Sequence, residues 1–380
     1  MRIRTLKLSD TQFGTQWFDE VADHWDYNDF RRNPAWRNGW ISFDCALHEP
    51  RADRIYLGIT SFGADIFKAY DRGTDRFADL GFARIADPFD AKFHRALCFG
   101  PDGCVYGAIA LLHDVDRYFE APGGAIVRYN PGTGGIAKIG VPLPHVYIQS
   151  MVLDGVRGVA YCLCFAPEKL AVFNLRTGES RDLGLLGTYG GMAQGENLIL
   201  DDAGCVWTSW TLTRAWASER GPDADRLCKY DPQLGHIVFY RHGLPKPDGS
   251  YGFAKLEGLF NFGDGFVYAS GANGSFYRIA PDKGLAEYLF TPTPDRRSRL
   301  SSLVKAEDGV AYGVTGRDGQ CELLRVFYRR GTFEKLGPIE DADGAALWQN
   351  HDIVRTSNGT LYICENDNPY RSSYLWEVRL

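Results

Sequence analysis

One short peptide pattern returns seven times along the chain and constrains the fold more than any other feature. It places a turn pair before apolar residues and an aromatic residue, as in "DGCVYGA" (102–108), "DGFVYA" (264–269) and "NGTLYI" (358–363). The seven aromatic residues are Tyr56, Tyr106, Tyr161, Trp207, Tyr268, Tyr312 and Tyr362. Spacings of 44 to 61 residues with glycine turns between them are typical of a β-propeller.

A second pattern follows the aromatic residue in most repeats. An apolar strand end leads into Asp or Asn and then Gly, as in "VRYNPGTGGI" (127–136) and "CKYDPQLGHI" (228–237), and this is a hairpin signal. The two patterns together predict an all-β, seven-bladed β-propeller whose blades are four-stranded and antiparallel. The expected blades cover about residues 41–82, 93–140, 146–186, 196–244, 251–290, 299–338 and 350–380.

The last repeat, residues 350–380, supplies only three strands, and an unpaired sheet edge is a liability. The opening "RIRTLKLS" (2–9) has the length and alternation of a strand. We therefore expect residues 1–10 to join the C-terminal blade and to close a single domain of residues 1–380. The alternative is that residues 1–40 form a separate cap.

Residues 11–40 form an N-terminal extension rich in tryptophan and arginine. Trp25, Trp36 and Trp40 lie close to several arginines, and aromatic faces beside guanidinium groups suit acidic sugars. The alternative interpretation is an extension that packs on the flank of the propeller.

The composition excludes several classes of partner. With 380 residues, 44% of them hydrophobic, and a net charge of −6 without a basic block, the chain is suited neither to nucleic acid nor to an anionic membrane. It shows no signal segment or long apolar run, so we expect a cytoplasmic monomer, or a secreted one if a signal was removed. Most of the nine cysteines lie in apolar runs and are expected to be buried, reduced thiols.

Propeller topology predicts which side chains share one mouth. The start of the first strand of a blade and the loop after its second strand lie on the same face. We therefore expect two histidines of blade two to converge with residues that begin blades three and seven. These residues are His94, His113, Tyr147, Gln149 and His351.

Long loops add further polar residues to this mouth. The loops of blades two and four and the loop 365–373 contribute Arg117, Arg214, Trp216, Asn366 and Arg371. Because the long insertions belong to only two blades, the mouth suits a small molecule or glycan better than a symmetric protein partner. Alternatively, each histidine is a structural residue that hydrogen-bonds to a neighbouring turn.

The runs "FHRALCFGPDGCVYGA", "VYIQSMVLDGVRGVAYCL" and "HDIVRTSNGTLYICENDNPYRSSYLWEV" resemble the β-propeller polysaccharide lyases. This group includes ulvan lyases and the lyases and rhamnosidases that act on rhamnosyl-glucuronate. The resemblance covers most of residues 40–380 and implies cleavage beside a uronic acid, with His94, His113 and Tyr147 as the catalytic residues. The sequence departs from the family at "YCLCFAPEKL" (161–170), which lacks an expected arginine, so Arg117, Arg214 or Arg371 would have to neutralise the carboxylate.

The residue types suit this chemistry. A proton next to a carboxylate is weakly acidic, so its removal needs a cation on the carboxylate and a base that works near neutral pH. Histidine is a base that works near neutral pH, and a protonated tyrosine can donate its proton to the departing oxygen.

Three hypotheses follow from the sequence. The first is a lyase that cleaves an acidic oligosaccharide or polysaccharide by β-elimination. The second is a glycoside hydrolase that removes a sugar linked to glucuronate, and the third is a propeller that binds a glycan or a protein without catalysis. None requires a cofactor. The resemblance also implies Ca²⁺ in the central channel as an option, although no calcium-loop pattern is present.

Overall fold

The computed structural model describes residues 1–13, 32–63, 65–113, 117–187, 197–214, 217–218, 225–249 and 255–380. The chain divides into two compact units. The first unit consists of Met1–Ile148 and Ile339–Leu380, and the second consists of Gln149–Pro338.

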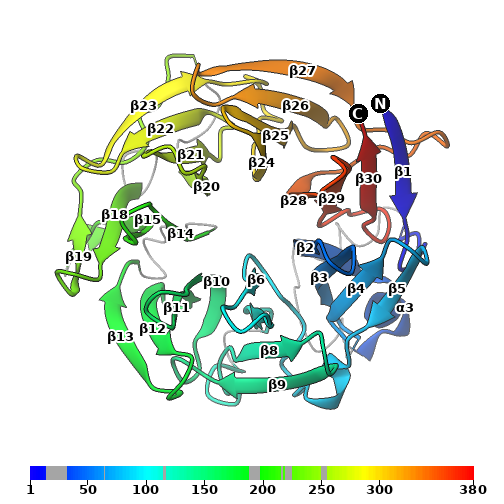
Figure 1. Ribbon diagram of the computed structural model, residues 1–380, viewed down its shortest axis with the longest axis horizontal. Helices are drawn as coiled ribbons and strands as arrows, with labels where there is room; N and C mark the ends of the chain where they lie inside the picture. The colour runs from blue at the N-terminus through cyan, green and yellow to red at the C-terminus, as the bar shows by residue number, and fades with distance from the viewer. Residues whose placement is uncertain are drawn as a thin grey trace. The chain divides into compact units, whose positions relative to one another are not determined.

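The first unit contains three four-stranded antiparallel sheets, labelled in Figure 1. One has the strands β2 (Ile41–Glu49), β3 (Arg54–Ser61), β4 (Phe67–Asp71) and β5 (Arg76–Asp79). Another has β6 (Cys98–Phe99), β7 (Val105–Ala108), β8 (Ile126–Asn130) and β9 (Gly135–Gly140). The third has β28 (Asn350–Arg355), β29 (Leu361–Glu365), β30 (Leu375–Arg379) and β1 (Arg2–Leu6). This unit also has the short helix α3 (Pro34–Gly39) and a 3-10 turn, η1 (Phe82–Arg84).

Four more four-stranded antiparallel sheets belong to the second unit. One sheet has β10 (Tyr147–Asp154), β11 (Val159–Phe165), β12 (Lys169–Asn174) and β13 (Ser180–Leu185), and the next has β14 (Ile199–Leu200), β15 (Val206–Thr211), β18 (Asp225–Asp231) and β19 (His236–Phe239). The third has β20 (Leu256–Asn261), β21 (Val267–Gly271), β22 (Phe276–Ala280) and β23 (Leu285–Phe290). The fourth has β24 (Leu303–Glu307), β25 (Val310–Thr315), β26 (Glu322–Phe327) and β27 (Thr332–Pro338). A small hairpin joins β16 (Thr213–Arg214) to β17 (Ala217–Ser218). The seven sheets confirm the predicted all-β, seven-bladed fold.

Each of the seven repeat aromatic residues lies on the second strand of its sheet. In the repeats of Tyr106, Trp207 and Tyr268 the turn aspartate accepts a hydrogen bond from the ring that follows. The Tyr106 hydroxyl donates to Asp102 over 3.1 Å, and the Cys104 amide donates to the same side chain over 3.1 Å. Trp207 repeats the arrangement with Asp201 over 2.8 Å. The short motif therefore fixes a turn and anchors a buried ring in one step.

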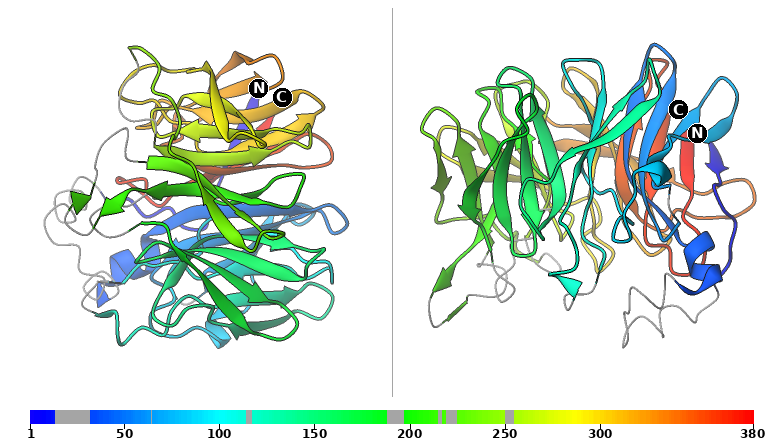
Figure 2. Two further views of the ribbon diagram at one scale, coloured as in Figure 1. Left: turned by 90° about the vertical axis from the view of Figure 1, so that its left-hand side faces the viewer. Right: turned by 90° about the horizontal axis from the view of Figure 1, so that it is seen from below.

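The predicted closure by the N-terminal strand is confirmed. β1 pairs with β30 in an antiparallel register that runs from Arg2 opposite Arg379 to Leu6 opposite Leu375. Figure 1 shows β1 beside β30, and both views in Figure 2 place the two chain ends next to each other. The edge of the three-stranded C-terminal repeat is covered in this way.

The described end of the N-terminal extension packs against the first unit. The Trp36 ring stacks on Phe13 at 4.9 Å, and the Trp40 ring lies 5.2 Å from Phe62. Both tryptophans are buried, which fits the packed-extension alternative for this part. Trp25 lies outside the described residues. No helix in the described ranges combines the length and the apolar character needed to cross a bilayer.

The closing strand leads to a stability prediction. Leu6 is 7% exposed and belongs to the main core cluster of the first unit. We expect Leu6→Ala to lower the free energy of unfolding by about 2–4 kcal/mol, because it leaves a cavity beside β30. Urea titration followed by tryptophan fluorescence would measure the change. The exposed neighbour Arg2 gives the control, and equal midpoints for Leu6→Ala and Arg2→Ala would contradict a supporting role for β1.

Candidate functional site

Backbone hydrogen bonds align three segments that carry predicted site residues in the first unit. The Ala110 amide donates to the Lys92 carbonyl over 2.9 Å, and the Ile148 amide donates to the Ile109 carbonyl over 3.0 Å. The segments around residues 92–94, 109–113 and 147–148 therefore run side by side. His94 precedes β6 instead of starting it as predicted, because residues 92 and 93 bridge to Thr60 and Ile109.

His113 and Tyr147 form a contact pair. Their ring centroids are 5.1 Å apart with the planes at 66°, an edge-to-face arrangement that aromatic rings favour. His113 is 6% exposed and Tyr147 is 1% exposed. The predicted convergence of these two residues is thus present in the structure, in surroundings that keep most water away.

A cation stands at the other end of the same row of rings. Phe89 packs edge to face on His113 at 5.4 Å, and the Arg117 guanidinium lies 5.3 Å from the Phe89 ring centroid. Arg117 also forms an ion pair with Glu120 at 2.6 Å, and its side chain is 29% exposed. We call Arg117, Phe89, His113 and Tyr147 the His113 row. The sequence pattern did not single out Phe89, which stands five positions before His94 in the mixed segment "DPFDAKFH" (87–94).

His94 contacts His351. The Nε2 atoms of the two rings are 3.0 Å apart, and both residues are almost fully buried. The Nδ1 of His351 donates to the backbone carbonyl of Asp44, because a carbonyl oxygen only accepts. His351 therefore carries a proton on Nδ1, and a second proton must lie between the two Nε2 atoms.

Asp44 and Lys92 complete this buried polar cluster. The Asp44 side chain is fully buried, Thr60 donates to it over 2.6 Å, and the Lys92 Nζ atom is 3.9 Å from its Oδ1. Burial raises the pKa of Asp44 to about 7, although the positive charge of Lys92 acts to lower it. Sequence reasoning overlooked both residues. The available signals were an aspartate inside the apolar run "ISFDCAL" and the K-x-H spacing, which puts Lys92 and His94 on one side of an extended segment.

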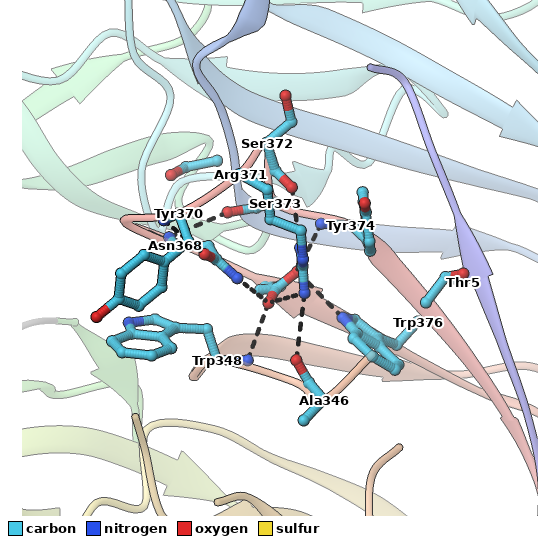
Figure 3. A network of polar contacts seen from close by, with 12 residues as sticks. Thr5, Ala346, Trp348, Asn368, Tyr370, Arg371, Ser372, Ser373, Tyr374 and Trp376 are labelled. Carbon is cyan, nitrogen blue, oxygen red and sulfur yellow. Dashed lines mark hydrogen bonds and ion pairs between the residues drawn. The ribbon is translucent and has the colours of Figure 1, made fainter. Parts of the chain in front are cut away.

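Arg371 has a different role from the predicted substrate contact. Its guanidinium binds both carboxylate oxygens of Glu365, over 2.8 and 2.9 Å, and Glu365 is completely buried. Figure 3 shows Arg371 within a network that also includes the Trp376 indole and the Trp348 backbone. Two aligned charge-assisted bonds are a strong contact, so the Arg371 charge is committed to holding the loop 365–373.

The remaining predicted residues fall in several places. Asn366 is buried and donates to Asp367 over 3.0 Å. In the second unit, Gln149 is the third residue of β10 and is half-buried, and Arg214 ends β16. Trp216 lies outside the described residues.

Within the described ranges, no three His, Cys, Asp or Glu side chains are grouped so as to hold a metal ion. The calcium hypothesis stays a prediction.

Comparison with known proteins shows the fold alone. No protein-family model matches the chain, and no curated protein matches its sequence. The WD40 repeats of RRP9 match with a TM-score of 0.60 at 10% identity, covering 100% of this chain and 97% of that one. The extracellular domain of a one-component system protein from B. thetaiotaomicron gives 0.58 at 12% identity, covering 89% of this chain, which spans only 38% of that one. An auxiliary nutrient binding protein from Bacteroides thetaiotaomicron gives 0.51 at 10% identity, covering 90% of this chain and 69% of that one.

The buried Arg371 ion pair leads to a prediction. Arg371→Gln would leave the Glu365 carboxylate buried without its cation, which we expect to lower the free energy of unfolding by about 3–5 kcal/mol. Arg379→Gln removes a guanidinium that is 54% exposed and pairs with Glu377 over 2.6 Å, and it should cost less than about 1 kcal/mol. Chemical denaturation of both variants measures the contrast. Similar denaturation midpoints for Arg371→Gln and Arg379→Gln would show that the buried Glu365 carboxylate does not need Arg371.

Asp44 leads to a prediction about pH. Its ordinary pKa of 3.8 applies in the unfolded chain, and burial raises the pKa to about 7 in the folded protein. The unfolded chain therefore releases this proton first, and the free energy of unfolding should fall as pH rises from about 4 to about 7. Asp44→Asn mimics the protonated form and should remove this loss, which is at most about 4 kcal/mol. Urea midpoints at pH 4.5 and pH 8 measure it, with Asp79→Asn, whose side chain is 63% exposed, as the control. A constant difference between Asp44→Asn and wild type at both pH values would contradict the raised pKa.

Proposed function

We propose that this chain is a lyase that cleaves a glycosidic bond beside a uronic acid by β-elimination, with the His113 row as its site. The observation that carries the proposal is the edge-to-face pair of His113 and Tyr147. A base and an acid for one elimination must reach neighbouring carbon and oxygen atoms of a single sugar, and two rings in contact satisfy this requirement. The resemblance of the surrounding motifs to propeller lyases agrees with it.

Each group of the row has one role. His113 takes the proton from C5 of the uronate, and the electrons of that C–H bond form the C4–C5 double bond. The C4–O4 bond breaks, and Tyr147 donates its hydroxyl proton to the departing oxygen. Transfer of the proton from His113 back to Tyr147, directly or through water, restores both groups. The reaction balances without an oxidant or a reductant.

Arg117 is the cation that supports this chemistry. Of the three arginines that could replace the missing one, Arg371 is committed to Glu365, whereas Arg117 is linked to His113 through Phe89. Arg117 lies one ring away from His113, and its present partner Glu120 is on the surface. A uronate carboxylate can take the place of Glu120 and gain a charge-assisted contact, which lowers the cost of forming a carbanion next to it.

Non-catalytic glycan binding is the second candidate. Tyr147 is 1% exposed, so a substrate has little of the proposed acid to touch. One of the structural neighbours is described as a nutrient binding protein. In this case the His113 row would line a binding site without taking part in a reaction.

Ultraviolet absorbance separates the candidates. Incubation with glucuronate oligosaccharides, rhamnosyl-glucuronate among them, should produce the absorbance of an unsaturated uronate. We expect His113→Gln and Tyr147→Phe each to lower the rate by about 10²- to 10⁴-fold, the contribution of a general acid or base. His236→Gln, at an exposed histidine, is the control and should keep the wild-type rate.

Other outcomes point elsewhere. Reducing sugar without the new absorbance would identify a hydrolase, and binding without turnover would favour the second candidate. Full turnover by both His113→Gln and Tyr147→Phe would remove the His113 row from the mechanism.

A further inference from the structure

A cluster of partly exposed aromatic rings begins at the residue after Arg117, the cation of the His113 row. Phe119 is 84% exposed, although burial of a phenylalanine side chain is favourable. Its ring lies 5.2 Å from Tyr118 and 5.7 Å from His145, and Tyr118 is 5.5 Å from His145. We call Tyr118, Phe119 and His145 the aromatic platform. The aromatic platform has no role in the proposed elimination.

The platform stands on a turn that is held in several ways. The amides of Glu120 and Ala121 both donate to the Arg117 carbonyl, over 3.0 and 3.1 Å, and the Arg117 guanidinium pairs with Glu120. The His145 Nδ1 donates to the Ala121 carbonyl over 2.8 Å. A surface ring on a turn with this many bonds loses little freedom when a ligand covers it, and such preorganisation favours binding.

His145 adds a sign of strain at the same place. Its backbone has a φ of 66°, in the left-handed region that a residue with a side chain seldom adopts. The bond from its own amide to the Pro122 carbonyl, at 3.0 Å, holds it there together with the Nδ1 bond. The strained backbone keeps the imidazole against Phe119 and Tyr118.

We infer that the aromatic platform is a sugar subsite, which stacks on the apolar face of the pyranose ring next to the uronate that Arg117 binds. The inference rests on the proposed function and extends it, because it names the second contact of the same glycan. Arg117 and Phe119 are two residues apart in one turn, so their Cα atoms are at most about 7 Å from each other. Adjacent sugars of one chain can therefore reach both residues.

The chemistry favours a sugar over another apolar occupant. A pyranose presents C–H groups on one face and hydroxyls at its rim, and the negative face of an aromatic ring attracts those C–H groups. The adjoining Arg117 selects a ligand that also carries a carboxylate. A uronate would bind Arg117, and a less polar neighbouring sugar, such as a deoxyhexose, would stack on the aromatic platform.

Calorimetric titration with two probes tests the subsite. The probes are glucuronate alone, which lacks the neighbouring sugar, and a glucuronate–rhamnose disaccharide, which carries it. We expect Phe119→Ala to weaken binding of the disaccharide about 5- to 10-fold, the loss of one stacking contact, and to change binding of glucuronate less than about twofold. Phe119→Trp should restore the affinity. Phe239→Ala, at a surface phenylalanine of the second unit that is 47% exposed, is the control and should bind both probes as the wild type does.

The outcomes separate this inference from the proposed function. If Phe119→Ala binds the disaccharide as tightly as wild type, or loses affinity equally for both probes, the subsite is overturned while the lyase proposal stands. Length-dependent loss of binding without any turnover would support the subsite and reject the lyase reaction. If the wild type binds neither probe, both are rejected.

Discussion

The pairing of the first strand with the last is the interaction on which the first unit depends. β1 joins the N-terminal segment to β30, so residues from both ends of the sequence pack in one unit. In the same unit β2 lies against β28, and His351 reaches the Asp44 carbonyl, 307 positions away. A chain with an open edge at β30 would not hold these polar groups in fixed geometry, because nothing local connects them.

The polar groups inside the first unit are arranged in two different ways. Buried charge must be paired or neutralised, and this holds in the cluster of Asp44, Lys92, His94 and His351. The Asp44 carboxyl has a raised pKa, and the His94 and His351 imidazoles share a proton. The His113 row instead joins an imidazole and a phenol to a partly exposed cation. The first arrangement is suited to structural integrity, and the second is the one for which we propose proton transfer on a ligand.

Two arginines of the first unit show why residue type alone does not identify a site. Arg371 and Arg117 both lie in loops, and both were candidates for a carboxylate contact. Glu365, with no exposed surface, holds Arg371 through two short bonds, whereas the partner of Arg117 is a glutamate that is 59% exposed. A ligand can displace a solvated partner at modest cost, but displacing a buried one leaves an uncompensated charge.

The repeat in the sequence was sufficient to determine the number of sheets, the position of each aromatic residue on a second strand and the need for a closing strand. These features depend on local turn chemistry and on the alternation of apolar residues, which a sequence displays directly. The contact of His113 with Tyr147 also followed from the repeat, because both positions have a fixed place in neighbouring repeats. Only the tertiary structure decided that His94 pairs with His351, that Glu365 occupies Arg371 and that Phe89 links Arg117 to His113. These are side-chain contacts between distant segments, and their geometry depends on how whole sheets pack, which no local pattern encodes.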